Sequence, residues 1–490
     1  MTTTLDRPAA IAAATRRPHR ALAPALIGLL GFLIPAVGIG IPSVWYDEAA
    51  TITATTRSWP QLWAMLGNVD AVHGLYYFVM HVVFDVFGYS PVMLRIPSAI
   101  AIGAAAALVV ILARHLGREH YAVLAGLVFV ILPRVTWAGT EGRSYALTAL
   151  AAVALTLVFV LARRSPGRRL WVLYGVLAVL SVVLFIYLAL IVLAHAVTVL
   201  VTTRRRAFFV AAGLAGVVTL PFALATIAQS GQVAWIDPIG SGTIRQVVRS
   251  QWFYGSDHFA IVAWALIALG VVMAVRQRRS LALVLPLLVV PTLALVVVSL
   301  VSSPIYQPRY LTMTTPFAAL AIAAGLAFIP WRKARFIALG LLVVLAVPQV
   351  LFQHSPESKE NSSWSQVADL IAHERELAGE SSTTAIVYGG VQRHPSATAR
   401  VIAYSYPDTF AGTIDLTLQT PAAETAQLWE THEPIALSLS GLSTADVTYL
   451  ITSVARDQRP ETSIAMQSAG WHLVESWEFT SVHVLKYKRD

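Results

Sequence analysis

Long apolar stretches dominate this sequence and constrain its fold more than any other feature. A membrane-spanning helix needs about 20 apolar residues in a row. Eleven stretches meet or approach that length: 21–42, 92–113, 121–138, 145–162, 170–186, 188–203, 207–228, 259–275, 281–301, 310–330 and 335–352. Of the 490 residues, 57% are hydrophobic and only 12% are charged, which excludes an ordinary soluble protein. The sequence therefore predicts a polytopic α-helical membrane protein with about 11 transmembrane helices.

Basic residues decide how these stretches are counted. Residues 170–203 could form one long helix or two joined helices. With two, every basic cluster falls on one side of the membrane, as expected for cytoplasmic loops. The clusters are Arg16/Arg17/Arg20, Arg114/Arg118, Arg163/Arg164/Arg168/Arg169, Arg204/Arg205/Arg206, Arg276/Arg278/Arg279 and Arg332/Lys333/Arg335. We therefore expect a cytoplasmic N-terminal tail (1–20), a transmembrane domain (21–352) whose first span is retained, and an extracytoplasmic C-terminal domain (353–490).

The C-terminal segment differs in character from the rest. Residues 1–352 contain 26 Lys and Arg against 9 Asp and Glu, whereas residues 353–490 contain 9 against 17. Helical and strand patterns such as "SSWSQVADLIAHEREL" and "TTAIVYGG" predict a small α/β domain. Its acidic net charge fits a soluble module that helps to recruit or position the acceptor; the alternative is a partner-docking or stability element. Because the chain has no cysteine, this domain folds without disulfides, and cysteine-based catalysis is excluded. The positive charges elsewhere lie between apolar stretches, which indicates membrane topology rather than binding to nucleic acid.

Acidic residues of the membrane region gather on the predicted external side. Only Asp6 and Glu119 are predicted to be cytoplasmic; the others are Asp47, Glu48, Asp70, Asp85, Glu141, Asp237 and Asp257. Charges near hydrocarbon are costly and often functional. Asp85 and Asp257 could simply solvate loops. Asp47 and Glu48 follow the first predicted span directly, which makes them the strongest candidates for chemistry.

The first external loop, residues 43–90, and three external arginines complete the candidate set. "SWPQLWAMLGNVD" and "GLYYFVMHVVFDVFGYS" are amphipathic enough to lie along the membrane interface, although their aromatic residues could equally be an ordinary interfacial belt. Arg95, Arg143 and Arg309 lie near headgroup depth on the external side. The two-pronged donors of a guanidinium group match a phosphate, so these arginines are candidate phosphate ligands. Alternatively, each side chain extends along the membrane to reach water or pairs with an acid, as Arg143 could with Glu141.

Five short motifs, in order between residues 41 and 320, resemble those of one enzyme family. They are the Asp47-Glu48 pair, "HGLYY" (73–77), "MLRIPSA" (93–99), "EGRSYAL" (141–147) and "PRYL" (308–311). Together they resemble the GT-C membrane glycosyltransferases, in particular the protein-mannosyltransferase and aminoarabinose-transferase branch (glycosyltransferase family 39-like) and its actinobacterial members. Gly74 and Gly142 replace the proline and alanine usual in two of these motifs.

The resemblance implies a GT-C fold and an inverting reaction. A monosaccharide, with mannose or arabinofuranose favoured, would pass from a polyprenyl-phosphate donor to a glycan, glycolipid or protein hydroxyl on the outer face of the membrane, in cell-envelope assembly. Asp47 would be the catalytic base, and Glu48, the second catalytic residue, would orient the acceptor or a helper residue such as Asp70 or His73. Arg309, Arg143 and Arg95 would bind the donor phosphate, with Asp70, His73, Glu141, Tyr145 and Tyr306 in support. A divalent metal, Mg or Mn, is also compatible, with Asp47, Asp70 and His73 as candidate ligands.

Two other classes of protein share some of these features. A lipid-linked sugar transporter or flippase also combines many spans with a few charges at membrane depth, and a catalytically degenerate membrane binding protein would keep the same motifs. Transporters tend to show internal repeats and sites at the middle of the membrane. Here the polar residues gather at one predicted face and no internal repeat is evident, which favours the enzyme.

Overall fold

A computed structural model describes residues 18–117, 119–165, 167–202, 206–277, 281–379, 381–391 and 396–489. They form two compact units. One, the helical unit, contains residues 18–37 and 95–351; the other, the mixed unit, contains residues 38–94 and 352–489. Most of the predicted N-terminal tail and seven basic cluster residues lie outside the described residues: Arg16, Arg17, Arg118, Arg204, Arg205, Arg278 and Arg279.

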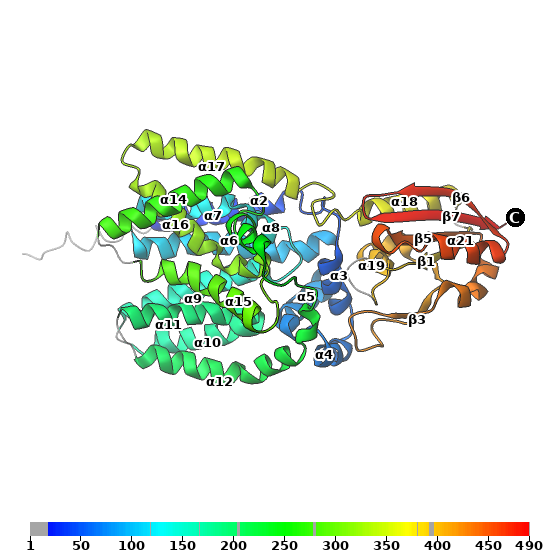
Figure 1. The fold of residues 1–490 in the computed structure, drawn as a ribbon, viewed down its shortest axis with the longest axis horizontal. Coiled ribbons are helices and arrows are strands. Elements are labelled where there is room, and N and C mark those ends of the chain that lie inside the picture. The colour runs from blue at the N-terminus through cyan, green and yellow to red at the C-terminus, as the bar shows by residue number, and fades with distance from the viewer. Residues whose placement is uncertain are drawn as a thin grey trace, which may run out of the picture. The chain divides into compact units, whose positions relative to one another are not determined.

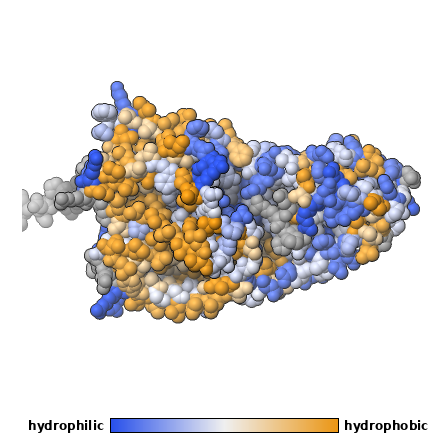
Figure 2. All heavy atoms as spheres, in the orientation of Figure 1, coloured by the Kyte–Doolittle hydropathy of each residue, from blue (hydrophilic) through white to orange (hydrophobic). Residues whose placement is uncertain are grey.

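The helical unit is built from helices, most of them apolar (Figure 1). They are α2 (Pro18–Ala36), α6 (Pro91–Leu116), α7 (Glu119–Ile131), α8 (Pro133–Gly139), α9 (Tyr145–Arg164), α10 (Arg169–Leu184), η2 (Ile186–Leu188), α11 (Ala189–Val201), α12 (Arg206–Ala228), η3 (Ser230–Val233), α13 (Ser241–Arg245), η4 (Gln246–Ser250), α14 (Asp257–Arg276), α15 (Val284–Val301), η5 (Pro308–Thr314), α16 (Thr315–Phe328) and α17 (Arg332–Gln353). Figure 2 shows that apolar residues make up most of the face of this unit that is turned to the viewer. Such a surface suits a lipid environment.

Each of the predicted spans coincides with one helix or with two consecutive helices. Among the described residues, seven helices are long and apolar enough to cross a membrane, and α7 with α8 makes an eighth, bent by 62°. The other three predicted spans are shorter apolar helices, Ala21–Ala36, Arg169–Leu184 and Ile186–Val201. The prediction of a polytopic α-helical membrane protein is confirmed.

Residues 170–203 form two helices, as the distribution of basic residues predicts. Phe185 is extended between α10 and η2. The hydroxyl of Tyr174 on α10 lies 3.0 Å from Nδ1 of His195 on α11, although 21 residues separate them. A straight helix would place about 30 Å between two such residues. The chain therefore turns back on itself, and one long helix is excluded.

Helix α16 forms the centre of the helical unit. It packs against α7 and α14, and its residues from Thr315 to Ala323 are all buried. Small side chains permit the close approach. A Cβ added at Gly325 would overlap the carbonyl group of Leu266 on α14, so only glycine allows the two backbones to meet here.

The mixed unit joins the predicted first external loop to the C-terminal residues. The loop contributes α3 (Tyr46–Thr55), α4 (Trp59–Asn68), η1 (Ala71–His73) and α5 (Gly74–Phe87). The C-terminal part contains α18 (Trp364–Ala378), β1 (Thr384–Tyr388), α19 (Arg400–Ser405), α20 (Pro407–Phe410), β2 (Ile414–Asp415), β3 (Leu418–Thr420), β4 (Thr431–His432), η6 (Ile435–Leu437), η7 (Leu439–Thr444), β5 (Val447–Ser453), η8 (Val454–Arg456), α21 (Arg459–Ser468), β6 (Trp471–Glu478) and β7 (Val482–Arg489).

A five-stranded sheet organises the C-terminal part, in the order β2-β1-β5-β7-β6. The strands β2, β1 and β5 run parallel, and β7 and β6 add antiparallel pairs. Strands β1 and β5 are buried along their whole length, which explains their near-continuous apolar sequences. The predicted α/β character of this segment is confirmed.

Direct hydrogen bonds connect the C-terminal residues to the first loop within the mixed unit. Helix α19 packs against α3. The backbone N–H of Val44 donates to the Tyr406 hydroxyl at 3.0 Å, and the Ser362 hydroxyl donates to the carbonyl oxygen of Val44 at 2.6 Å. The Tyr89 hydroxyl donates to the carbonyl oxygen of Ser405 at 2.8 Å. The loop and the C-terminal residues therefore pack as one body.

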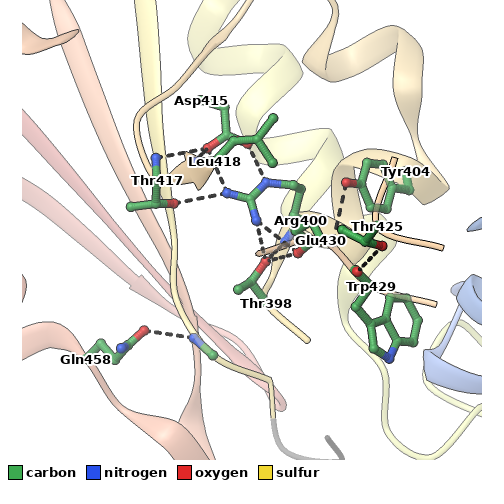
Figure 3. Close-up of polar contacts among 11 residues, drawn as sticks. Thr398, Arg400, Tyr404, Asp415, Thr417, Leu418, Thr425, Trp429, Glu430 and Gln458 are labelled. Carbon is green, nitrogen blue, oxygen red and sulfur yellow. Dashed lines mark hydrogen bonds and ion pairs between the residues drawn. The ribbon is translucent and has the colours of Figure 1, made fainter. Parts of the chain in front are cut away.

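A buried ionic network stabilises the C-terminal part (Figure 3). Arg400 donates from Nη2 to Asp415 at 2.8 Å and from Nη1 to Glu430 and Thr398, each at 2.9 Å. The side chains of Arg400 and Glu430 are 3% and 0% exposed. Burial works to lower the pKa of Arg400, but the hydrogen bond and charge of Asp415 and the charge of Glu430 outweigh it and raise that pKa above its ordinary value.

Removing Arg400 should destabilise the mixed unit. In Arg400→Met the carboxylate of Glu430 would stay buried without its cation, and breaking such a pair costs about 3–5 kcal/mol. The measurement is the shift of the unfolding midpoint of the purified full chain. As a control, Arg459→Met breaks ion pairs with Asp457 and Glu478 near the protein surface, each worth less than about 1 kcal/mol. Equal shifts in the two variants would contradict the prediction.

Candidate functional site

Helix α3 carries the predicted acid pair. Trp45 is extended and precedes the helix, and Asp47 and Glu48 occupy its first turn. Acidic groups there interact favourably with the positive end of the helix dipole. Asp47 is half-buried, whereas Glu48 is fully buried. The two neighbouring acids thus have different environments, and of the two only Asp47 is partly accessible from outside the protein.

The expectation that the pair ends the first span needs correction. The first apolar helix, α2, ends at Ala36 rather than at residue 42. Residues 37–42 form turns and bends, and residues 43–45 lead without regular structure into α3. Gly38 has a left-handed backbone with φ of 73°, which reverses the chain locally. Asp47 is therefore held by its own short helix and not by the membrane-spanning one.

The predicted supporting residues Asp70 and His73 lie at the start of α5. Asp70 has a left-handed backbone with φ of 59°, an uncommon conformation that asparagine and aspartate tolerate best. Its carboxylate accepts a hydrogen bond from the Tyr77 hydroxyl at 2.6 Å, and its carbonyl oxygen accepts one from the His73 N–H at 2.9 Å. The "HGLYY" motif therefore serves to orient Asp70, and α5 packs against α3.

The predicted metal ligands do not form a ligand set. Within the described parts of the chain, no three His, Cys, Asp or Glu side chains come together in a way that could hold a metal ion. Asp47, Asp70 and His73 therefore do not fit a shared Mg or Mn ion.

In the helical unit, two of the sequence motifs lie side by side. The Ser98 hydroxyl on α6 donates to the carbonyl oxygen of Glu141 at 2.7 Å. Arg95 lies one turn before Ser98 on the same helix, and Arg143 follows Glu141 in the turn that leads into α9. All three predicted charged residues are buried, with Arg95 and Glu141 at 0% exposure and Arg143 at 7%. The sequence predicted this grouping but placed these side chains closer to the surface.

Arg309 is the most accessible of the three predicted phosphate ligands. It is half-buried, and its guanidinium carbon lies 5.1 Å from the ring of Trp235 and 6.0 Å from that of Tyr310. Tyr310 in turn stacks with Tyr145 at 6.5 Å and lies 5.4 Å from Tyr187. Tyr145 and Arg309, 164 positions apart in the sequence, thus both contact the ring of Tyr310.

The predicted supporting residue Tyr306 lies beside a second arginine, which sequence reasoning missed. The Tyr306 hydroxyl donates to Gln251 at 3.2 Å. Arg134 donates to the carbonyl oxygens of Ser250 at 2.6 Å and Gln251 at 3.3 Å. Its guanidinium also lies 4.7 Å from the ring of Trp137. Because Nε and Nη2 of Arg134 donate to backbone carbonyls, this side chain positions the segment around Gln251.

Two other predicted external acids have local partners. Asp85 accepts from His81 at 3.1 Å, one turn away on α5. Asp257 forms an ion pair with Arg249. Both acids are exposed, which agrees with the interpretation that Asp85 and Asp257 solvate loops.

No protein-family model matches the chain, and no curated protein matches it. Among solved structures, it is similar to ArnT from Cupriavidus metallidurans bound to undecaprenyl phosphate, with a TM-score of 0.63 and 14% identity over 94% of this chain and 97% of that one. The chain is also similar to the Archaeoglobus fulgidus oligosaccharyltransferase tethered with an acceptor peptide, with a TM-score of 0.51 and 11% identity. That match covers 90% of this chain and 70% of the other. It is similar as well to a mycobacterial arabinofuranosyltransferase, AftD, with a TM-score of 0.51 and 17% identity. That match covers 96% of this chain and 41% of the other. The chain therefore has the fold of the GT-C membrane glycosyltransferases, as its motifs predict.

Proposed function

We propose that this protein is an inverting glycosyltransferase that uses a polyprenyl-phosphate sugar. One observation carries the proposal: the fold matches, over 94% of this chain and 97% of the other, a structure that contains undecaprenyl phosphate. The acceptor is a hydroxyl of a glycan, glycolipid or protein on the outer face of the membrane. Mannose or arabinofuranose is the favoured sugar, and the fold similarity to an arabinofuranosyltransferase agrees with an actinobacterial cell-envelope role.

Asp47 is the proposed catalytic base. A hydroxyl nucleophile needs a carboxylate within hydrogen-bond reach, on the side of the sugar opposite to the departing phosphate. Asp47 is half-buried in the first turn of a rigid helix, whereas Glu48 is fully buried. A partly open carboxylate can receive an acceptor, so the environment favours Asp47 as the base. Glu48, buried in the first turn of α3, is proposed to orient the acceptor or a helper residue and not to act as the base.

Arg309 is the proposed principal ligand of the donor phosphate. Negative charge develops on the phosphate as the sugar leaves, and a fixed guanidinium stabilises that charge. The rings of Trp235 and Tyr310 limit the positions that the Arg309 side chain can adopt. Arg95 and Arg143 are the other two proposed phosphate ligands. Both side chains are buried, and Glu141, in the same turn as Arg143, is proposed to orient Arg143.

Sugar transfer by the purified protein tests the proposal. The full chain in lipid nanodiscs is incubated with radiolabelled polyprenyl-phosphate mannose or arabinofuranose and a panel of glycan, glycolipid and peptide acceptors. Transfer of label to an acceptor, lost in Asp47→Asn, is the expected result. In proteoliposomes, movement of the labelled lipid between leaflets without transfer would instead identify a transporter. Binding alone would identify a degenerate binding protein.

The topology provides an independent prediction. Eleven spans with the basic clusters in the cytoplasm place the C-terminal residues outside the cell. A phosphatase that is active only after export should therefore be active when fused after Asp490. The control fusion, after Arg164 in a predicted cytoplasmic cluster, should be inactive. Activity in the reverse pattern would contradict both the span count and the proposed side of the reaction.

A further inference from the structure

One short segment of the C-terminal part holds both ends of the acid-bearing helix. This segment, residues 421–430, is called the brace. At the start of α3, the Tyr46 ring packs on Trp429 with 5.2 Å between centroids. Just beyond its end, Arg57 donates from Nη2 to the carbonyl oxygens of Gln427 at 2.6 Å and Leu428 at 3.1 Å. Asp47 and Glu48 lie between these two attachments.

Arg57 is suited to hold this helix because it is buried and fixed. It is 5% exposed, and its Nε donates to the carbonyl oxygen of Thr53 within α3 at 3.0 Å. The carbonyl oxygen of Arg57 itself lies 2.7 Å from Nε2 of His81 on α5. Burial lowers the pKa of Arg57 to about 10, so the side chain still carries its charge at neutral pH. A buried charge is costly unless it is hydrogen-bonded. Here Nε donates to a carbonyl group of α3 and Nη2 donates to two carbonyl groups of the brace, whereas Nη1 is buried and has no hydrogen-bond partner among the described residues.

The brace is itself rigidly held. The Thr425 hydroxyl donates to the carbonyl oxygen of Trp429 at 3.0 Å and accepts from the N–H of Gln427 at 3.1 Å, which closes a tight turn. Glu430, the last residue of the brace, accepts from Arg400 and Thr398 in the buried network (Figure 3). Arg400, at the start of α19, and Thr398, just before it, therefore hold the brace, and the brace holds α3.

We propose that the brace positions Asp47 for catalysis and that Arg57 and Glu430 are its positioning residues. This inference rests on the proposed function. It assigns the C-terminal part to the chemical step rather than to recruitment of the acceptor. A misplacement of about 1 Å at a reacting group can cost about 100-fold in rate. Loss of the brace should therefore lower kcat while the KM values for donor and acceptor change little.

The experiment compares four variants of the full chain in nanodiscs: Arg57→Ala, Arg57→Lys, Glu430→Gln and Arg375→Ala. Arg57→Ala should lower kcat by about 10–100-fold, and hydrogen exchange in residues 46–56 should accelerate. Arg57→Lys should recover part of both effects because an ammonium can still donate to a brace carbonyl. Glu430→Gln should lower kcat less. Arg375→Ala is the matched control, because Arg375 donates to the carbonyl oxygens of Thr409 and Ala411, away from α3; its kcat should be unchanged.

The outcomes separate this inference from the proposed function. A raised acceptor KM with unchanged kcat in Arg57→Ala would overturn the inference in favour of acceptor recruitment. Unchanged exchange in residues 46–56 would overturn it without any need for activity. A wild-type protein that transfers no sugar would overturn the proposed function, and exchange in Arg57→Ala would still decide whether the brace holds α3.

Discussion

Replacing Asp47 by asparagine should lower turnover by about 10²–10⁴-fold, the usual contribution of a positioned general base. The amide is nearly isosteric with the carboxylate, so α3 should keep its fold, but an amide cannot accept the proton of the acceptor hydroxyl. Donor affinity should stay within about threefold, because the change removes a step of the reaction rather than a contact of the donor. Single-turnover rates and donor binding, measured on the same preparation, test both statements.

Asp85→Asn is the matched control for this experiment. It is the same chemical change in the same unit, at an acid whose partner is His81 on its own helix. Turnover should be retained there. Near wild-type turnover in Asp47→Asn would remove Asp47 from its role. Loss of donor binding in that variant, restored by added Mg or Mn, would instead assign Asp47 to a metal site.

Replacing Arg309 by alanine should weaken binding of the donor by about 10–100-fold, as expected for a hydrogen bond to a charged group. Arg309→Lys should restore only part of the affinity, because an ammonium cannot present two donors in the fork that matches a phosphate. Titration with undecaprenyl phosphate measures this effect without requiring the correct sugar.

Arg245→Ala provides the control for Arg309. Arg245 is exposed at the end of α13 in a predicted external segment, so its removal changes the net charge equally. The affinity of the Arg245→Ala variant for the donor should stay close to that of the wild-type protein. An equal loss in both variants would indicate general electrostatic attraction, and unchanged affinity in Arg309→Ala would exclude that residue from the donor site.

Two positioning arginines escaped sequence reasoning for different reasons. Arg134 lies within the predicted span 121–138, directly after Pro133. An arginine after a proline inside an apolar stretch is a signal that a helix breaks there, and it could have been noticed. Arg57 carries no such signal, because it follows α3 in a loop that contains ordinary polar residues. Its role depends on carbonyl groups 370 and 371 positions away in the chain.

Properties set by neighbouring residues could be read from the sequence alone. Apolar length predicted the helices, and the basic clusters predicted that residues 170–203 turn back, which the contact between Tyr174 and His195 confirms. The α/β character of the C-terminal part and the GT-C fold also followed from local patterns and motifs. These features depend on hydrophobic period and charge within about 20 residues, which a sequence displays directly.

Properties that depend on distant contacts were decided only by the tertiary structure. The early end of α2, the burial of Arg95 and Arg143, and the brace around α3 each depend on which surfaces meet in space. The sequence indicated that Asp47 and Glu48 matter, but not that only Asp47 is partly open. Burial and hydrogen-bond partners result from packing between segments that can lie hundreds of residues apart. The local sequence pattern does not indicate which of these segments pack together. The acids of this protein were therefore visible in its sequence, whereas the residues that position them became visible only in the folded chain.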